Sequence, residues 1–223
     1  MTKLPLTLGF DTSGAYCAAA LLRGTEVIAS ANEDMARGQA ERIMPLIEEV
    51  LTAGGATWQD LSAIGVGIGP GNFTGIRISV AAARGLGLAL RIPIVGVSHF
   101  EALALGYDAP VVCTVAAPRA KLYAQTMNDG TAAKAVLCDL DSLSLPDPTL
   151  KAAGLGSHAE QIADLTGGPV VAPQYSVEEA IARQAMLRMH DIDLQPPAPM
   201  YLRPADAAPS RHAAPVILAE TQQ

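Results

Sequence analysis

Apolar and polar positions alternate in short runs over the first part of the chain. The segments Leu4–Asp11, Tyr16–Leu22 and Glu26–Ala31 have the length and apolar content of strands, and Ser13-Gly14 and Gly24 mark turns between them. We therefore predict that the chain begins with a meander of three strands.

Helix-like and strand-like patterns alternate after this meander. We predict a helix at Glu41–Ala53 ended by Gly54-Gly55, a strand from Ile64, a helix at Thr74–Arg91, a strand at Ile94–Val97 and a helix from Ser98. Three meandering strands followed by helix, strand, helix, strand is the order of a ribonuclease-H-like lobe with a mixed sheet. The sequence therefore predicts an α/β lobe over residues 1–108.

A second, smaller lobe is predicted over residues 109–204. V-V-C-T-V-A-A after Pro110 and K-L-Y-A-Q-T-M from Lys121 resemble paired strands, Ala135–Leu140 continues the lobe, and Gly154–Ser157 resembles a turn that opens a helix. An amphipathic helix at Val177–Met189 either closes this lobe or packs back on the first. Residues 205–223 are mostly Ala, Pro and polar residues, which favours a flexible tail.

A glycine-rich turn joins the strand from Ile64 to the helix that follows it. It reads G-P-G-N-F-T-G, and we expect Thr74 to cap the helix and leave the first amides free for an anion. A tight connection that binds nothing is the alternative interpretation. The candidate anion-binding residues, including the turn after the first strand, are Asp11, Thr12, Ser13, Gly69, Gly71, Asn72, Thr74 and Gly75.

Two helices carry the sequence argument for a partner. The only charges on Thr74–Arg91 are arginines seven residues apart, and the remainder is almost entirely apolar, so we expect burial on more than one side. Small residues four apart would let another helix approach closely. The alternative is that the two helices simply cover each other. The candidate interface residues are Glu41, Met44, Ile47, Glu48, Leu51, Arg77, Ala81, Arg84, Gly85 and Leu88.

Composition narrows the possible functions. The net charge of −7 over 223 residues opposes unaided binding to nucleic acid, because affinity for phosphate backbones comes largely from Lys and Arg. Three cysteines without a C-x-x-C pair indicate reduced thiols in the cytoplasm. We expect no signal peptide and no membrane span, since Arg77, Arg84 and Arg91 interrupt the longest apolar tract.

Four motifs in the first half of the chain closely resemble those of the TsaB family, and P-A-P-M-Y-L-R resembles the family's closing motif. The four are L-G-F-D-T-S-G, E-R-I-M-P-L-I, G-P-G-N-F-T-G-I-R and P-I-V-G-V-S-H-F-E-A-L-A. The resemblance implies a two-lobed actin-like (ASKHA) fold and a non-catalytic subunit in the synthesis of N6-threonylcarbamoyladenosine in tRNA. It implies pairing through the two helices with the catalytic subunit TsaD, or with a second copy as a homodimer.

The resemblance also implies the ATPase TsaE as a further partner, and contact with tRNA only through the complex. We expect this chain to require no cofactor by itself, although the resemblance allows ATP or ADP at a subunit junction. The catalytic relatives hold metal with H-x-x-x-H, whereas the matching site here has His99 followed by Leu103 in the second position, so we expect no metal site. We interpret His99 as a helix N-terminal or surface histidine.

An actin-like small-molecule kinase or ATPase is the main alternative, and a homodimeric scaffold for another partner is the next. Asp11-Thr12-Ser13 stands where such kinases place their first phosphate turn, and Asp11 could hold a magnesium-bound water. Its simpler role is to tie the hairpin through backbone N–H bonds. The second phosphate turn reads Ala116-Ala117-Pro118 and lacks the family's carboxylate, which argues against independent nucleotide hydrolysis.

Overall fold

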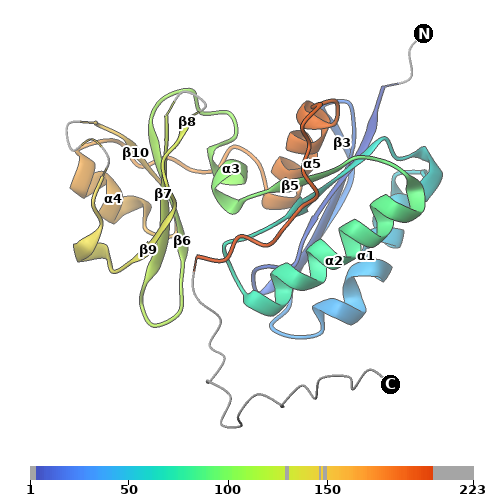
Figure 1. Ribbon diagram of the computed structural model, residues 1–223, viewed down its shortest axis with the longest axis horizontal. Coiled ribbons are helices and arrows are strands. Elements are labelled where there is room, and N and C mark those ends of the chain that lie inside the picture. Colours follow the sequence, from blue (N-terminus) through green and yellow to red (C-terminus); the bar gives the residue numbers. More distant parts are fainter. Residues whose placement is uncertain (1–3, 129–130, 146, 148–149, 203–223) are drawn as a thin grey trace, which may run out of the picture.

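The computed structural model describes residues 4–128, 131–145, 147 and 150–202, which form two α/β lobes lying side by side (Figure 1). This is the two-lobed actin-like architecture that the sequence predicts. The first lobe is built on a mixed sheet with the order β3-β2-β1-β4-β5. Its strands are β1 (Leu6–Asp11), β2 (Tyr16–Arg23), β3 (Glu26–Asp34), β4 (Ala63–Gly67) and β5 (Ile94–Val97).

Helices cover both faces of the first sheet (Figure 1). On one face α1 (Gln39–Ala53) and α2 (Phe73–Leu90) enclose an apolar core in which Leu8 and Phe10 are fully buried. On the other face lies α5 (Val177–Arg188), which the chain reaches only after building the second lobe. A Cβ atom at Gly9 or Gly65 would come within 2.4 Å of the α5 backbone, so these glycines allow α5 to approach the sheet closely.

The second lobe contains β6 (Val111–Ala116) and β7 (Leu122–Asn128), which pair in antiparallel fashion as predicted. Its other elements are β8 (Thr131–Ala132), β9 (Val136–Cys138), β10 (Ala153–Gly156) and α4 (Ala159–Thr166). Two short 3-10 helices lie in connecting segments of the chain: η1 (Trp58–Asp60), between α1 and β4, and η2 (Leu140–Ser142), between β9 and β10. The prediction of a helix-opening turn at Gly154–Ser157 is wrong, because Gly154 to Gly156 pair with β6 as a parallel strand. The helix begins only at Ala159.

A short helix, α3 (His99–Ala104), lies where the two lobes meet. Ser98 caps it, and Phe100 is buried in the core of the second lobe with Val111 and Leu155. α3 also packs on α5, which belongs to the first lobe. This helix therefore lies between the two lobes and contacts both of them.

The predicted elements of the first lobe are confirmed within a few residues. α1 starts at Gln39, two residues earlier than expected, and β3 continues to Asp34. The helix predicted at Val177–Met189 exists and takes the second of its two predicted positions, against the first lobe. The predicted tail at residues 205–223 lies outside the described residues.

Within the described residues, α2 is the one helix long and apolar enough to span a membrane by length and composition. Its mean hydropathy is 1.3, and 28% of the stretch is buried. One such helix gives weak support for a membrane location, because core helices of soluble proteins can also meet these criteria. Here Ile76, Val80 and Ala83 are buried on the side that packs against the first sheet. The helix therefore covers one face of that sheet, and its outer side is exposed.

Candidate functional site

The glycine-rich turn does not leave the amides at the start of α2 free. Asn72, not Thr74, is the N-cap: its Oδ1 accepts from the amides of Thr74 and Gly75 at 2.9 and 3.0 Å. The amide of Asn72 itself donates to the carbonyl of Ser13 at 2.7 Å. The predicted role of Thr74 is therefore wrong, because the helix begins at Phe73 and Thr74 lies inside its first turn.

The turn after β1 packs directly beneath this cap. Thr12 is buried, and its hydroxyl donates to the carbonyl of Gly75 at 2.7 Å. A Cβ at Gly75 would come within 1.9 Å of the Thr12 carbonyl oxygen, and one at Gly71 within 2.5 Å of the Ser13 carbonyl oxygen. The candidate anion-binding residues are thus brought together, and Thr12, Ser13, Asn72, Thr74 and Gly75 bond to one another, whereas Oδ1 of Asp11 is buried without a hydrogen-bond partner. The glycines serve close backbone packing, which favours the interpretation as a tight connection.

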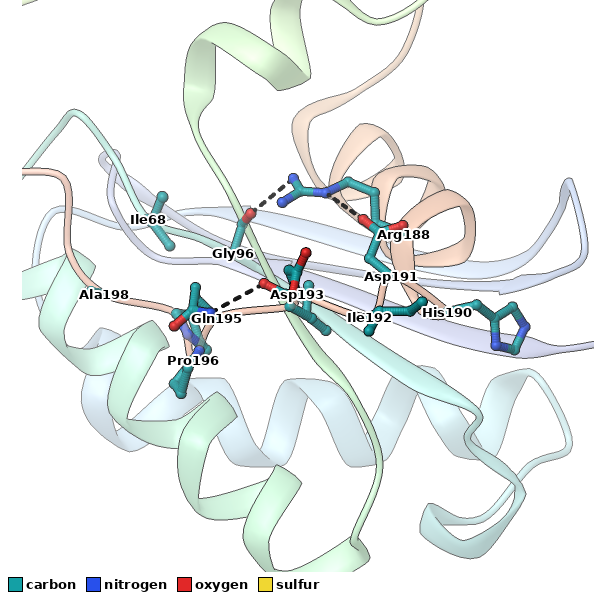
Figure 2. Close-up of a pocket in the computed structure, with 12 residues that line it drawn as sticks. Ile68, Gly96, Arg188, His190, Asp191, Ile192, Asp193, Gln195, Pro196 and Ala198 are labelled. Atoms are coloured by element: carbon teal, nitrogen blue, oxygen red, sulfur yellow. Dashed lines mark hydrogen bonds and ion pairs between the residues drawn. The ribbon is translucent and has the colours of Figure 1, made fainter.

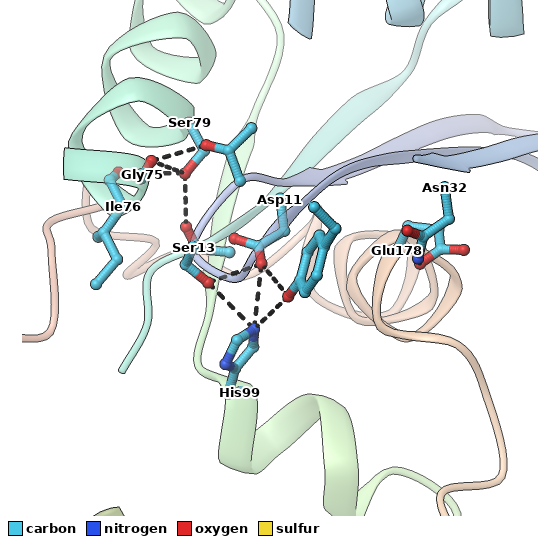
Figure 3. Close-up of polar contacts among 11 residues, drawn as sticks. Asp11, Ser13, Asn32, Gly75, Ile76, Ser79, His99 and Glu178 are labelled. Carbon is cyan, nitrogen blue, oxygen red and sulfur yellow. Dashed lines mark hydrogen bonds and ion pairs between the residues drawn. The ribbon is translucent and has the colours of Figure 1, made fainter. Parts of the chain in front are cut away.

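Four polar side chains converge at the inner end of this turn (Figure 3). The carboxylate of Asp11 accepts at Oδ2 from the hydroxyls of Ser13 at 2.7 Å and Tyr16 at 2.6 Å. Nε2 of His99 lies 3.1 Å from the same oxygen. We call these four residues the Asp11 cluster. Asp11 is fully buried, and the His99 side chain is only 12% exposed.

This arrangement corrects two expectations from the sequence. His99 does start α3, but its ring is turned into the protein and is not a surface group. Asp11 binds side-chain hydroxyls and an imidazole, whereas a tie through backbone N–H groups was expected. The contribution of Tyr16 was missed, because nothing in the strand pattern distinguishes an inward hydroxyl from a packed ring.

The electrostatics of the cluster favour a charged pair. Burial alone raises the pKa of Asp11, but the hydrogen bond and charge of His99, together with the Tyr16 and Ser13 hydroxyls, lower that pKa below its usual value. Burial alone lowers the pKa of His99, and its bond to Asp11 more than reverses this and raises it. Burial and the neighbouring carboxylate raise the pKa of Tyr16, so the phenol stays protonated.

The cluster is not arranged as a nucleophilic triad. Ser13 and Asp11 both approach Nε2 of His99, so the imidazole has no separate nitrogen with which to relay a proton between them. Ser13 is also buried and donates its proton to Asp11. Within the described residues, no group of three or more His, Cys, Asp or Glu side chains is placed to hold a metal ion.

The altered second-lobe motif forms the end of the β6–β7 hairpin. Ala116 ends β6, and the amide of Ala117 donates to the carbonyl of Lys121 across the turn. Arg119 and Ala120 both have positive φ, at 63° and 55°. A tight hairpin end without a carboxylate offers no group to hold a phosphate-bound cation.

The candidate interface residues of α2 form one exposed outer side. Arg77, Ala81, Arg84, Gly85 and Leu88 are all exposed, and we call these five residues the α2 outer face. Leu88 is 83% exposed, and a Cβ at Gly85 would meet no atom within 4 Å. The expectation that more than one side of α2 is buried is therefore not met among the residues that the structure describes.

The candidate interface residues of α1 divide between surface and core. Glu41 and Glu48 are exposed and Met44 is half-buried. Ile47 and Leu51 are 0% and 3% exposed because they pack into the core under the first sheet, so their assignment to an interface is wrong. Both are apolar residues beside the glutamates of this helix, and that pattern does not tell the inner side of a helix from its outer side.

An aromatic pair that the sequence analysis did not single out adjoins the α2 outer face. The rings of Phe73 and Tyr201 stack with centroids 4.8 Å apart, and the guanidinium of Arg77 lies over Phe73. Both rings are exposed. The segment that carries Tyr201 is anchored on the first lobe by a bond from the Met200 amide to the Ile68 carbonyl.

A separate pocket of about 760 Å³ lies beside the end of α5 (Figure 2). Its wall includes Gly96, Ile68 and the loop from His190 to Ala198. Arg188 lines it but is already engaged, since its guanidinium bonds to the Gly96 carbonyl and to Glu101. Asp191 lies 3.7 Å from the same guanidinium. The cationic group at this wall is therefore already partnered within the chain.

Comparison with known proteins gives three kinds of match. A family model described as TsaD, tRNA N6-adenosine threonylcarbamoyltransferase, matches residues 26–146. The tRNA threonylcarbamoyladenosine biosynthesis protein TsaB of Escherichia coli is 37% identical over 99 residues, which cover 44% of this chain and 42% of that protein. The match thus spans less than half the length of this curated relative.

Two further matches extend over nearly the whole chain. An uncharacterized protein of Mycobacterium tuberculosis is 31% identical over 213 residues, covering 93% of this chain and 96% of that protein. The solved structure of YeaZ from Pseudomonas aeruginosa has the same fold, with a TM-score of 0.70 and 24% identity over 89% of this chain and all of that one.

Proposed function

Because the chain belongs to the TsaD family of tRNA N6-adenosine threonylcarbamoyltransferases, and within it to the TsaB-like members, we propose that it acts in the synthesis of N6-threonylcarbamoyladenosine in tRNA. Its role is that of a non-catalytic subunit that pairs with the catalytic subunit TsaD. TsaE joins the same assembly, and tRNA binds to the complex rather than to this acidic chain alone.

The α2 outer face is the observation that carries this proposal. It joins a largely exposed leucine, an uncovered glycine and two arginines on one side of an otherwise apolar helix. An apolar helix side of this kind is normally covered in a working protein. The open space at Gly85 lets the backbone of a partner helix come close.

The charges on the two helices fit a partner that supplies carboxylates. Glu49 of α1 is already paired with Arg42 at 2.6 Å, and Arg42 also binds Glu33. Arg77 and Arg84 lie exposed on α2, and no carboxylate of the described residues is seen to bind either one. We propose that they bind acidic side chains of TsaD, or of a second copy when the chain is isolated.

The Asp11 cluster fits the non-catalytic role. In a nucleotide-hydrolysing enzyme Asp11 would need to face a bound cation, whereas here His99, Tyr16 and Ser13 occupy its Oδ2 and the other oxygen, Oδ1, is buried without a hydrogen-bond partner. Catalytic residues and any nucleotide at a subunit junction are accordingly assigned to the partner's side of the complex.

Reconstitution with purified TsaD and TsaE tests the proposal. We expect modified adenosine to form only when this chain is present, and the double variant Arg77→Glu/Arg84→Glu to lose TsaD binding and modification together. Arg23→Glu/Lys151→Glu makes the same charge change at exposed positions away from α2 and serves as the control. Like charges that face each other at a desolvated contact cost several kcal/mol, against less than about 1 kcal/mol at a solvated surface.

Two results would contradict this assignment. Full modification without the chain would remove it from the pathway. Turnover of ATP by the isolated chain at an enzyme-like rate would favour the small-molecule kinase instead. Wild-type TsaD affinity in the arginine double variant would keep the chain in the complex but move the interface away from α2.

A further inference from the structure

The last described residues lie beside the start of the α2 outer face. The ring of Tyr201 stacks on Phe73, which is the first residue of α2. One position earlier, the Met200 amide donates to the Ile68 carbonyl at 2.8 Å. These two contacts fix the place from which residues 203–223 continue, and we call those residues the closing segment. The closing segment therefore departs from one end of a helix whose outer side is exposed.

The sequence of the closing segment contains one apolar run. Val216, Ile217 and Leu218 are consecutive, whereas the other residues of the segment are Ala, Pro and polar or charged residues. Three large apolar side chains in a row gain free energy when another apolar surface covers them. Glu220 follows two positions after the run and brings a carboxylate, which pairs well with a guanidinium. The run and its glutamate thus form a short motif with an apolar part and an acidic part.

The far half of the α2 outer face offers the complementary pair of contacts. Leu88 is 83% exposed, and a Cβ at Gly85 would meet no atom within 4 Å, so an apolar side chain from another segment has room there. Arg84 is exposed on the same side, and no carboxylate of the described residues is seen to bind it. An uncovered leucine beside an arginine matches an apolar run followed by a glutamate.

The length of chain available matches the distance to be covered. Gly85 and Leu88 follow Phe73 by 12 and 15 positions, which corresponds to about 18–22 Å along an α-helix. Val216 follows Tyr201 by 15 positions, and a coil of that length has a root-mean-square span of about 20 Å. A tether whose mean span equals the separation of its ends gives the highest effective concentration, on the order of millimolar. Even a weak contact is populated under that condition.

We propose that the apolar run Val216–Leu218 binds the α2 outer face of its own chain at Gly85 and Leu88, with Glu220 beside Arg84, and thereby competes with the partner subunit. The contact stands on the reach and the complementarity above, whereas the competition rests on the function proposed for this face. An intrinsic affinity from about 0.1 to 1 mM at a millimolar effective concentration covers about half to nine-tenths of the molecules. Because TsaD binds only the uncovered fraction, its apparent affinity falls about twofold to tenfold.

The contact is tested first, on the full chain without a partner. A spin label is placed at Thr221→Cys, and Cys138→Ser removes the half-buried thiol. The label broadens the amide signals of residues close to it in the nuclear magnetic resonance spectrum. We expect broadening at the amides of Gly85 and Leu88, and none at Gln161, an exposed residue of α4 in the second lobe. Sharp signals at Gly85 and Leu88 would overturn the proposal.

A matched pair of variants identifies the run as the cause. Ile217→Asp/Leu218→Asp places two charges in the run, and we expect it to remove the broadening. Ala207→Asp/Ala208→Asp makes the same charge change within the closing segment but spares the run, so the broadening should remain. Both variants change residues outside the two lobes that the structure describes, and circular dichroism confirms that each one folds. Broadening that survives in Ile217→Asp/Leu218→Asp would overturn the role of the run.

A mixed sample separates contact within one chain from contact between two copies. Spin-labelled chain without isotope enrichment is mixed with ¹⁵N-enriched chain that has no label, at a concentration where light scattering shows a monomer. Only contact between copies can broaden signals in this mixture, and we expect none. Broadening as strong as in the singly labelled sample would overturn the proposal in favour of a second copy.

Titration with TsaD tests the competition. We expect Ile217→Asp/Leu218→Asp to bind TsaD about twofold to tenfold more tightly than the wild type, and Ala207→Asp/Ala208→Asp to bind like the wild type. Equal affinity in all three proteins would overturn the competition. Failure of all three to bind TsaD would overturn the proposed function together with the competition, whereas the amide signals would still decide the contact.

Discussion

Gly85→Leu separates an interface role for α2 from a purely structural one. Glycine inside a helix costs about 0.8–1 kcal/mol relative to alanine or leucine, and Gly85 stands in the interior of an 18-residue helix. A side chain there enters open space, since a Cβ would meet no atom within 4 Å. We therefore expect the isolated monomer to become more stable by about 0.5–1 kcal/mol, which corresponds to a rise in Tm of about 2 °C.

Association should change in the opposite direction. A leucine at a close helix crossing, where axes approach to about 8 Å, must displace the partner, and overpacking of this kind costs about 1–3 kcal/mol. The association constant with TsaD, or with a second copy, should fall about tenfold to hundredfold. Circular dichroism melting and isothermal titration measure the two quantities. Gln161→Leu, an exposed site on α4, is the control for added apolar surface.

The two expected changes, higher monomer stability and lower affinity, have opposite signs, so each can fail separately. A monomer that is destabilised would show that Gly85 packs against something within its own chain. A stabilised monomer with unchanged affinity would show that the α2 outer face is not the contact surface, whatever the partner.

Three further predictions concern the monomer. Gly87→Ala should lower the free energy of unfolding by up to about 2 kcal/mol in denaturant titration. Its Cβ would lie 2.3 Å from Ile94 Cγ1, and overpacking of about 1–3 kcal/mol exceeds the gain of about 0.8–1 kcal/mol in helix propensity. Unchanged stability would show that β5 can move there. Ala120→Gly should stabilise the fold by about 0.5–1 kcal/mol. It relieves backbone strain of about 1–2 kcal/mol at φ 55°, which exceeds the cost of the greater conformational entropy of glycine in the unfolded chain. A lower Tm would contradict this. Folding lowers the pKa of Asp11 and raises the pKa of His99, so this pair contributes its full stabilisation of the fold between about pH 4 and 6.5. Stability should fall below that range as Asp11 is protonated and above it as pH passes the raised His99 pKa, and His99→Gln should flatten the alkaline limb of the profile.

The sequence by itself determined the order and type of nearly all the elements in the first lobe. Apolar period and turn residues gave the three-strand meander, and Gly54 ends α1 where expected. These features depend on neighbours within a few residues, so a linear pattern contains them. The family motifs in the first half added the fold class and the pair of helices to inspect.

Only the tertiary structure decided which groups meet. The sequence analysis grouped Ile47 and Leu51 with Glu48 as interface candidates, but their burial depends on where the sheet lies. His99 and Asp11 are 88 positions apart, so their contact arises only when β1 and the start of α3 are brought to one point. The sequence left two positions possible for α5, because its apolar side could pack on either lobe. The structure places it on the first sheet, where the glycines of β1 and β4 allow close approach.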